Sequence, residues 1–312
     1  RNFVSENIKN GKWQLVFQFL AGLMEDKVHL PSEIITDLLP VKTEMKESAD
    51  YNEEWTENED KMVTCWPTED ERDLAVTFFK CSNESDKMES IVQRKLQQIN
   101  FNFVNFIRGH LTAVDCSSLV NVIKNVQQIS HLDLSHNNVG PLGCFEICKL
   151  LKCRESQLSW LNLKHNQLTD ETAKYLAEAF NNNSCQLRTL DLSENNISDI
   201  GAQHLAKAIN NNCQLRTLNL SLNNISHLGA QHLAEAINDN NNCQLHTLNL
   251  YRNNISDIGA QHLADAINNN NCQLLTLNLS RNNISDIGAQ HLAEAINKNC
   301  PLRTLEDRKS VV

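Results

Sequence analysis

Four histidines recur at one position of a repeated segment, and imidazole groups are common zinc ligands and common general acids and bases. Each lies in a run whose apolar spacing predicts a helix, so the four are expected on successive helices. Neighbouring helix axes pack about 8 to 10 Å apart, whereas zinc lies about 2 Å from each ligand nitrogen. One metal ion is therefore not expected to join them, and we interpret them as an exposed helical stripe. The four are His204, His232, His262 and His291.

Five of the eleven cysteines follow the same repetition. Their spacing lacks the paired CxxC pattern of zinc sites, and a small apolar side chain suits the entrance to a strand, so we expect reduced structural thiols. No Ser/His/Asp or Cys/His set is identifiable from spacing. The sequence therefore predicts no catalytic residue, no metal and no cofactor, and the protein is not expected to be an enzyme. The cysteines at predicted strand entrances are Cys185, Cys213, Cys243, Cys272 and Cys300.

The elements that position these side chains repeat every 28 to 30 residues. Six near-copies of one segment, from Gln128 to Ile284, follow the leucine-rich-repeat pattern LxxLxLxxNxL. In one copy, Leu190 and Leu192 alternate with polar residues, as in a strand with one buried face. Ser198 and Asp199 then predict a helix start, and the apolar residues at 200, 205, 206 and 209 are assigned to one buried helical face. We predict an α/β solenoid, a horseshoe with a parallel sheet inside and helices outside.

Two further columns of the repeat have structural explanations. Gly201 and its counterparts are expected to let neighbouring backbones pack closely. The Asn of the pattern follows each strand where the chain turns, so its amide is expected to satisfy backbone groups of neighbouring turns. These ladder residues are Asn137, Asn166, Asn195, Asn223, Asn253 and Asn282.

Charge separates residues 1–100 from the rest of the 312-residue chain. They carry 12 Lys and Arg against 20 Asp and Glu, whereas residues 101–312 carry 16 against 18. The acidic residues concentrate in a predicted solvated linker near 42–70. Amphipathic helices are predicted on either side of it, at 13–23, 34–39, 74–79 and 88–99. We therefore predict a small all-α domain at 1–100. A solenoid of about seven full repeats and a partial eighth, a minimal cap or a truncated array, should follow at 101–312.

The region before the repeats resembles NOD-like receptors. The segments at 11–23, 74–81 and 111–119 look like the junction where helices behind the nucleotide-binding NACHT module lead into ribonuclease-inhibitor-type leucine-rich repeats. The resemblance implies a cytosolic innate immune receptor whose repeats sense ligands and restrain the NACHT module. None of the nine glycines forms the GxxxxGK[ST] loop that holds nucleotide phosphates, so no nucleotide site is expected in this chain.

Two other classes of protein stay open. A freestanding ribonuclease-inhibitor-like binding protein, or a GTPase-activating leucine-rich-repeat protein, would also bind a protein partner without intrinsic catalysis. No basic patch with interleaved aromatic residues indicates nucleic acid, and no apolar run reaches membrane-spanning length. We expect protein partners, among them the chain's own upstream NACHT module, and a cytoplasmic location.

Recognition residues are expected where the repeats vary along the inner face of the sheet. If Leu190 and Leu192 point into the core, Thr189, Asp191 and Ser193 face the concave side, with Glu194 at its rim. The residue before each ladder Asn varies most, and Trp160, Lys164 and Tyr251 also break the pattern. These are the candidate protein-binding residues; neutral drift on a solvated face is the alternative. The variable column is His136, His165, Glu194, Leu222, Arg252 and Arg281.

Overall fold

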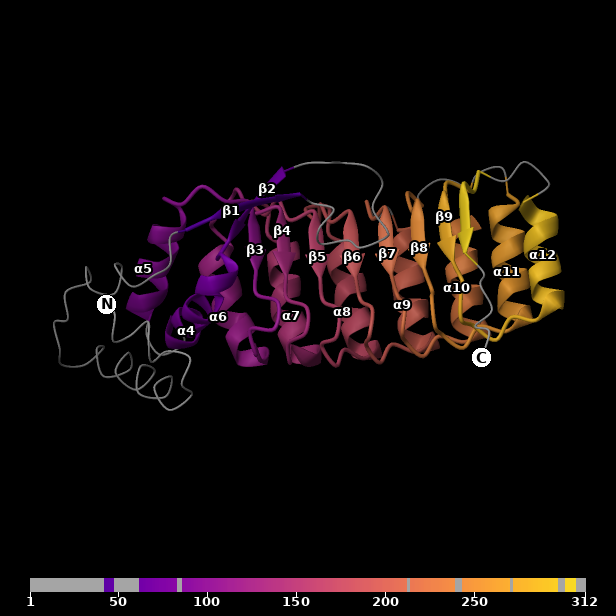
Figure 1. Cartoon of the computed structure of the whole chain (residues 1–312), viewed down its shortest axis with the longest axis horizontal. Helices are drawn as coiled ribbons and strands as arrows, with labels where there is room; N and C mark the ends of the chain where they lie inside the picture. Colours follow the sequence, from indigo (N-terminus) through magenta and orange to yellow (C-terminus); the bar gives the residue numbers. More distant parts are fainter. Residues whose placement is uncertain are drawn as a thin grey trace.

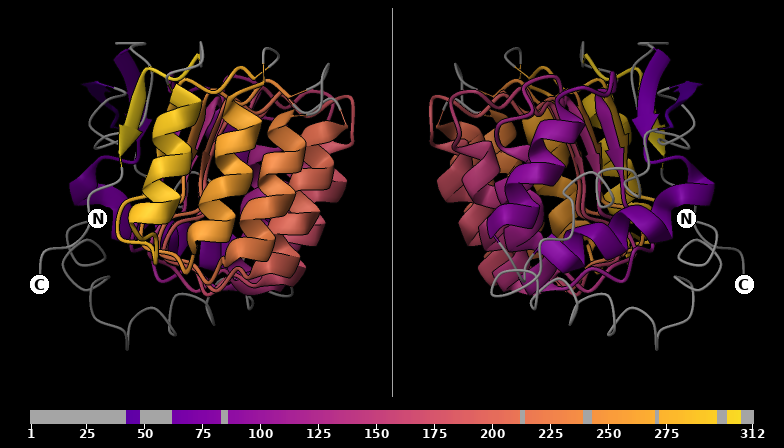
Figure 2. Two further views of the ribbon diagram at one scale, coloured as in Figure 1. Left: turned by 90° about the vertical axis from the view of Figure 1, so that its right-hand side faces the viewer. Right: turned by 90° about the vertical axis from the view of Figure 1, so that its left-hand side faces the viewer.

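The computed structural model describes residues 42–47, 62–82, 86–211, 214–238, 243–269, 272–296 and 301–306. These residues form two layers, a continuous sheet and a row of helices that covers one of its faces (Figures 1 and 2). The other face of the sheet, which we name the open face, is the side seen in Figure 1.

The sheet follows the order of the sequence from β1 to β10. Its first pair of strands is antiparallel, and every later pair is parallel. The strands are β1 (Glu44–Glu47), β2 (Met62–Trp66), β3 (Phe103–Asn105), β4 (His131–Asp133), β5 (Trp160–Asn162), β6 (Thr189–Asp191), β7 (Thr217–Asn219), β8 (Thr247–Asn249), β9 (Thr276–Asn278) and β10 (Thr304–Glu306).

One helix follows each strand from β3 to β9, and each of these helices packs on the next. Parallel neighbours require such a crossover, because the chain must return to the same end of the sheet before the next strand begins. The helices are η2 (Glu69–Glu71), α4 (Arg72–Ser82), α5 (Asp86–Leu96), α6 (Ala113–Ile123), α7 (Gly140–Leu151), α8 (Asp170–Phe180), α9 (Asp199–Asn210), α10 (His227–Asn238), α11 (Asp257–Ile267) and α12 (Asp286–Ile296).

The strand leucines stack in register. Leu161 pairs with Leu190, and Leu190 pairs with Leu218, on adjacent parallel strands. Leu190 and Leu192 are both fully buried between the sheet and the helices. The prediction of an α/β leucine-rich-repeat solenoid with one continuous core is therefore confirmed.

Helix α9 begins as predicted but buries a different face. The Ser198 hydroxyl caps the helix and accepts a hydrogen bond from the Ile200 N–H at 3.3 Å. The side chain of Ile200, however, is 60% exposed, whereas Leu205, Ala206 and Ile209 are buried. The assignment of Ile200 to the buried face was wrong, because five residues along an α-helix turn the side chain by about 140°.

The sheet begins earlier than the sequence indicates. Strands β1 and β2 fall inside the predicted acidic linker near 42–70 and inside the segment that was expected to be all-α. Strand β2 pairs in parallel with β3, with Trp66 opposite Val104, and Trp66 is fully buried. The physical reason is composition, since Met62–Trp66 is mostly apolar and joins the core rather than the solvent.

The helical part of that prediction is met downstream of β2. Helices α4 and α5 lie where the amphipathic patterns at 74–79 and 88–99 predict them. The helices expected at 13–23 and 34–39, and the most acidic part of the predicted linker at 48–61, lie outside the described residues. The boundary between residues 100 and 101 stays a prediction.

Candidate functional site

The variable column adopts a left-handed backbone. All six residues have φ between 54° and 57°, and Arg108 extends the column with φ of 55°. Residues with a Cβ atom rarely adopt this conformation, and Gly or Asn accept it most readily. We name these residues, at the carboxyl ends of the strands, the turn row: Arg108, His136, His165, Glu194, Leu222, Arg252 and Arg281.

The ladder asparagines hold the turn row in place. Asn223 Oδ1 accepts a hydrogen bond from the Ile197 N–H at 3.0 Å, and its Nδ2 donates to the Leu192 and Leu220 carbonyls at 3.0 and 3.1 Å. Asn223 is buried, whereas the neighbouring Asn224 is exposed and its side-chain amide donates to the Asn196 side chain. The prediction that the ladder amides satisfy backbone groups of adjacent turns is confirmed.

A second polar ladder, not predicted, crosses the strands. Asp191 Oδ1 accepts a hydrogen bond from the Ser193 N–H at 2.7 Å, and Asn219 Nδ2 donates to Asp191 Oδ2 at 3.0 Å. Burial raises the pKa of Asp133 and of Asp191, although these N–H donors favour the charged carboxylate. The recurrence of Asp or Asn between the two strand leucines of each repeat could have predicted this second ladder. The expected exposure of Ser193 on the inner face is wrong, because its side chain is buried.

The amino-terminal half of the turn row forms an ion-pair cluster. Lys164 Nζ lies 3.0 Å from Glu194 Oε1, and His165 Nδ1 lies 3.3 Å from Glu194 Oε2. The rings of His136 and His165 stack with their centroids 5.0 Å apart. The structure therefore brings together three of the predicted binding residues, Lys164, His165 and Glu194, with His136 beside them.

The electrostatics of this cluster follow from its contacts. Partial burial pushes the pKa of Glu194 up, but the hydrogen bond from Lys164 and the nearby positive charges bring it below its ordinary value. Partial burial lowers the pKa of His136, and the charges of His165, Lys164 and Arg108 lower it further. At neutral pH the cluster therefore contains a carboxylate held mainly by Lys164.

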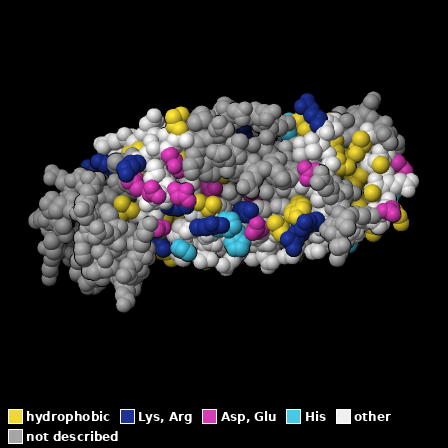
Figure 3. All heavy atoms as spheres, in the orientation of Figure 1, with side chains coloured by type: hydrophobic (Ala, Val, Ile, Leu, Met, Phe, Trp, Pro, Cys, Tyr) yellow, Lys and Arg dark blue, Asp and Glu magenta, His cyan; other side chains and the backbone are white. Residues whose placement is uncertain are grey.

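The carboxyl-terminal half of the turn row carries arginine and tyrosine. The Arg281 guanidinium lies over the Tyr251 ring, 5.6 Å from its centroid, and both Arg252 and Arg281 are exposed. We name Leu222, Tyr251, Arg252 and Arg281 the cationic patch. Figure 3 shows Lys, Arg and His side chains along the lower part of the open face, with an acidic group among them.

Trp160 lies apart from the other predicted binding residues. It is the first residue of β5, at the opposite end of that strand from Lys164 and His165. Its side chain is only 5% exposed and packs against Phe103 and His131, with ring centroids 5.5 and 5.8 Å away. The structure thus places Trp160 in an aromatic cluster, and not on an exposed rim.

Exposed apolar side chains, which were not predicted, form a row at the starts of six helices. Its members are between 50% and 68% exposed. The sequence contained a signal for this row, because an apolar residue directly precedes Gly201 and each of its counterparts. Single exposed apolar residues are ordinary on protein surfaces, and their repetition is what distinguishes this edge. The row is Val114, Leu142, Ile200, Leu228, Ile258 and Ile287.

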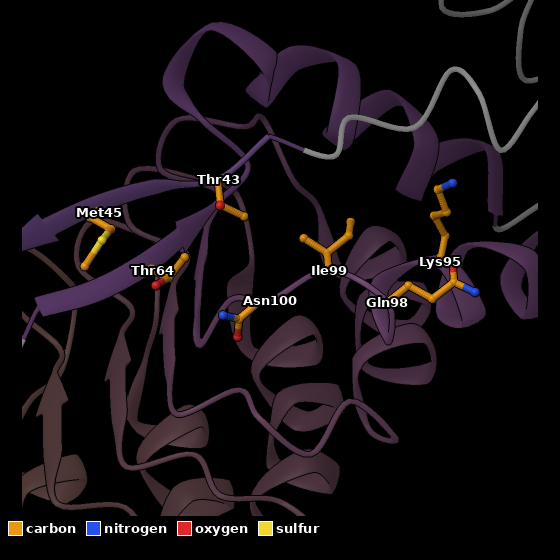
Figure 4. A pocket seen from close by; sticks show the side chains of 7 residues that line it. All are labelled: Thr43, Met45, Thr64, Lys95, Gln98, Ile99 and Asn100. Carbon is orange, nitrogen blue, oxygen red and sulfur yellow. The ribbon is translucent and has the colours of Figure 1, made fainter.

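An open hollow of about 580 Å³ lies far from the turn row, between the β1–β2 hairpin and the end of α5 (Figure 4). Among the described residues that line it, Lys95 is the only charged side chain, so they combine no acid, base and nucleophile. The remaining lining residues are Thr43, Met45, Thr64, Gln98, Ile99 and Asn100.

The histidine and cysteine columns do not assemble a reactive centre in the described part of the chain. Within it, no group of three or more His, Cys, Asp or Glu side chains has a metal-binding arrangement. In the same part, Cys116, Cys144, Cys148, Cys153 and Cys185 form no disulfide and are mostly buried, and burial together with Asp115 raises the pKa of Cys116 to about 12. A thiol of that pKa stays protonated at neutral pH and is a poor nucleophile. Nor is any described helix long and apolar enough to cross a bilayer.

Comparison with known proteins supports the repeat assignment. The family model described as "Leucine Rich repeat" matches six segments, residues 129–148, 158–177, 183–206, 211–234, 241–264 and 270–293. No curated protein sequence matches the chain.

Two solved structures are similar to the chain at low identity. One is internalin C2 from Listeria monocytogenes, which has 22% identity and a TM-score of 0.43, over 69% of this chain and 84% of that one. The other is actin-binding site 2 of leiomodin-1, which has 19% identity and a TM-score of 0.38, over 49% of this chain and 89% of that one. The matched segments coincide with the stacked strand and helix units, so from residue 129 to residue 293 this chain is a leucine-rich-repeat solenoid.

Proposed function

We propose that this chain is the protein-binding repeat region of a cytoplasmic NOD-like receptor and acts by binding, without catalysis. In this proposal the turn row, together with Lys164 and Tyr251, contacts the partner, and the upstream NACHT module is one partner that the repeats restrain. The observation that carries the proposal is the left-handed backbone of the whole turn row.

The choice of residues in the turn row works against backbone stability. A left-handed conformation costs a residue with a Cβ atom about 1 to 2 kcal/mol, and Asn or Gly lowers that cost. The chain places Asn at the next position of six of these turns and Gly at the seventh, yet its turn row carries His, Glu, Leu and Arg. Side chains retained against the backbone preference support a role that depends on the side chain itself.

The frame beneath the turn row suits recognition. Ladder amides such as Asn223 fix each turn to the preceding repeat. A rigid base reduces the conformational entropy lost on binding, and Arg and Tyr are enriched among residues that dominate protein interfaces. The proposed binding surface is therefore a set of variable side chains on an invariant hydrogen-bonded support.

The test uses the complete receptor, with its NACHT module. The variant replaces His165, Glu194, Arg252 and Arg281 by Asn, which removes the side chains but favours the left-handed backbone, so folding is expected to be retained. We expect higher basal signalling and weaker co-purification of the NACHT module with the repeats.

The matched control replaces two exposed arginines at the opposite end of the strands, Arg188→Asn and Arg216→Asn. A complete reading frame without a GxxxxGK[ST] segment would overturn the receptor assignment. If the turn-row variant folds and behaves like the control, the binding role of the turn row is wrong.

A further inference from the structure

We infer that the cationic patch binds an acidic peptide segment of a partner protein, with Arg252 and Arg281 each holding a carboxylate. This inference rests on the proposed function, because the patch consists of Tyr251 and the last three residues of the turn row. It adds the chemistry of the partner, which the proposed function leaves open.

The two arginines belong to neighbouring turns. The Leu222 N–H donates to the Tyr251 carbonyl at 2.8 Å, and the Arg252 N–H donates to the Ser280 carbonyl at 2.9 Å. Adjacent strands lie about 4.8 Å apart, so the two left-handed turns present like charges side by side. Such a pair repels itself, and an anionic partner between the side chains would relieve the repulsion.

In the carboxyl-terminal half of the turn row, no carboxylate of the described residues pairs with the arginines, whereas Glu194 pairs with the positive groups of the other half. Lys164 and His165 share the carboxylate of Glu194, at 3.0 and 3.3 Å. Within the described residues, no Asp or Glu forms an ion pair with Arg252 or Arg281, although the whole chain carries a net charge of −10. The patch is therefore a local positive site on an acidic protein, open to a carboxylate from outside.

Tyr251 and Leu222 adapt the patch to a peptide. The Tyr251 ring holds the Arg281 guanidinium by a cation–π contact at 5.6 Å, which orients its N–H donors without using them. A guanidinium so oriented can bind a carboxylate through two parallel hydrogen bonds. The half-buried Leu222 adds an apolar contact for the methylene groups of an acidic side chain.

Carboxylates on both sides limit the length of the bound segment. Glu194 precedes Leu222 in the turn row, and Glu306 on β10 accepts a hydrogen bond from Asn278 Nδ2 at 3.0 Å. A nucleic acid binding surface needs an extended positive groove with several stacking aromatic residues, and here the positive stretch spans two turns. A short acidic peptide fits these limits better than a phosphate backbone.

The experiment follows the arginine Nε–Hε signals of the intact chain by NMR. The probe is a synthetic peptide of alternating Glu-Glu and Gly, and the same peptide with Gln in place of Glu is its neutral control. We expect the Glu peptide to shift the Arg252 and Arg281 signals and to bind more weakly as salt increases. The Gln peptide should leave both signals unchanged.

Paired variants locate the site. Arg252→Asn/Arg281→Asn should lower the affinity for the Glu peptide by about tenfold or more. Tyr251→Ala should also lower this affinity, whereas Tyr251→Phe should retain it. The control Arg188→Asn/Arg216→Asn makes the same charge change at the opposite end of the strands. An equal loss in the control would overturn the inference, because binding would then follow net charge alone.

Inorganic phosphate and a single-stranded RNA oligonucleotide complete the test. Tighter binding of either than of the Glu peptide at this patch would overturn the acidic-peptide assignment, as would unmoved Arg252 and Arg281 signals at millimolar peptide. This measurement needs no NACHT module. If the peptide does not bind, the proposal that the repeats restrain the NACHT module is unaffected. If the receptor variant shows no loss of restraint, the inference of peptide binding is likewise unaffected.

Discussion

Three consecutive residues of one turn, Leu222, Asn223 and Asn224, have three different environments. Leu222 is half-buried with a left-handed backbone, Asn223 is buried in the ladder, and Asn224 is exposed. Their types alone do not distinguish the two asparagines; the hydrogen bonds between repeats do. The loss of stability caused by a mutation in these turns should therefore depend on the number of backbone hydrogen-bond partners that the side chain has, and not on the residue type.

We expect Asn223→Ala to lower the free energy of unfolding by about 1 to 3 kcal/mol, because the Ile197 N–H and the Leu192 carbonyl lose a buried partner. Asn224→Ala should cost less than about 0.5 kcal/mol, as exposed substitutions usually do. Urea unfolding at pH 7 measures both. Equal midpoints for the two variants would show that the amide ladder contributes nothing specific.

His136 should make the fold less stable in mild acid. Its pKa is lowered by partial burial and by the charges of His165, Lys164 and Arg108, so the unfolded chain takes up this proton first as the pH falls below about 6.5. Stability contributed at this position is thus present at neutral pH and is lost on acidification. His136→Asn, which suits the left-handed turn, should reduce the drop in unfolding free energy between pH 7.5 and 5.

The measurement for His136 is a pair of urea titrations at those two pH values for both proteins. Glu194 acts in a lower window, because its lowered pKa means that its contribution is lost only as the pH falls below the ordinary glutamate range. The buried Asp133 and Asp191 are common to both proteins. A variant with the same pH dependence as the parent would show that His136 has no such role.

At the scale of the element, the starts of α9, α10 and α12 are each tied by an aspartate to the repeat before them. Asp199, which lies in the first turn of α9 as predicted, also accepts hydrogen bonds from the Ser226 N–H, the Ser226 hydroxyl and the Gly229 N–H of the next repeat, at 2.7, 2.6 and 2.8 Å. A methyl group added at Gly229 would lie 2.6 Å from Asp199 Oδ1, which explains the glycine. The predicted close-packing role of this glycine column is confirmed.

His227 interrupts this aspartate ladder and gives its clearest test. It occupies the place of Asp199 in α10, and the next N-cap, Ser256, makes no side-chain capping hydrogen bond to α11. His227→Asp should restore acceptors for Ser256 and Gly259 and place a negative charge at a helix start. We expect a gain of about 1 to 2 kcal/mol.

Thermal unfolding of the two chains checks the gain, with His227→Ala as the matched variant that supplies no acceptor. The Ala variant should stay within about 0.5 kcal/mol of the parent. If the Asp and Ala variants melt together, removal of the histidine and not completion of the ladder would account for any change.

At the scale of the whole molecule, the periodicity of the sequence predicted the strand and helix of each repeat. The packing of neighbouring repeats determined which individual side chains are buried or paired. Leu190 and Leu218 could be placed on adjacent strands because their spacing equals the repeat. The exposure of Ile200 and the burial of Trp160 depend on helix rotation and on neighbouring strands. The same holds for the site, since residue variation marked the turn row but gave no sign of its left-handed backbone or of the pairing of Lys164 with Glu194.

The amino-terminal end shows the largest effect of stacking. Trp66 lies outside any repeat copy, yet its ring contacts Phe79, Phe101 and Phe106, with centroids 6.1, 5.3 and 5.9 Å away. Removing the residues before 101 would expose Phe101 and Phe106, which are now 1% and 0% exposed, together with the edge of β3. A solenoid end without a cap loses both stability and solubility.

We therefore expect residues 101–312 to be less stable than residues 42–312, although the repeats are intact in both. The loss should be several kcal/mol, and Trp66→Ala in the longer chain should by itself cost about 3 to 5 kcal/mol, as large buried aromatic residues do. Urea unfolding measures stability, and size-exclusion chromatography shows whether the shorter chain associates through its exposed aromatic end. If the two chains unfold at the same urea concentration and Trp66→Ala does not change stability, then β2 and α4 do not stabilise the solenoid. In that case the boundary between residues 100 and 101 is the true edge of the solenoid.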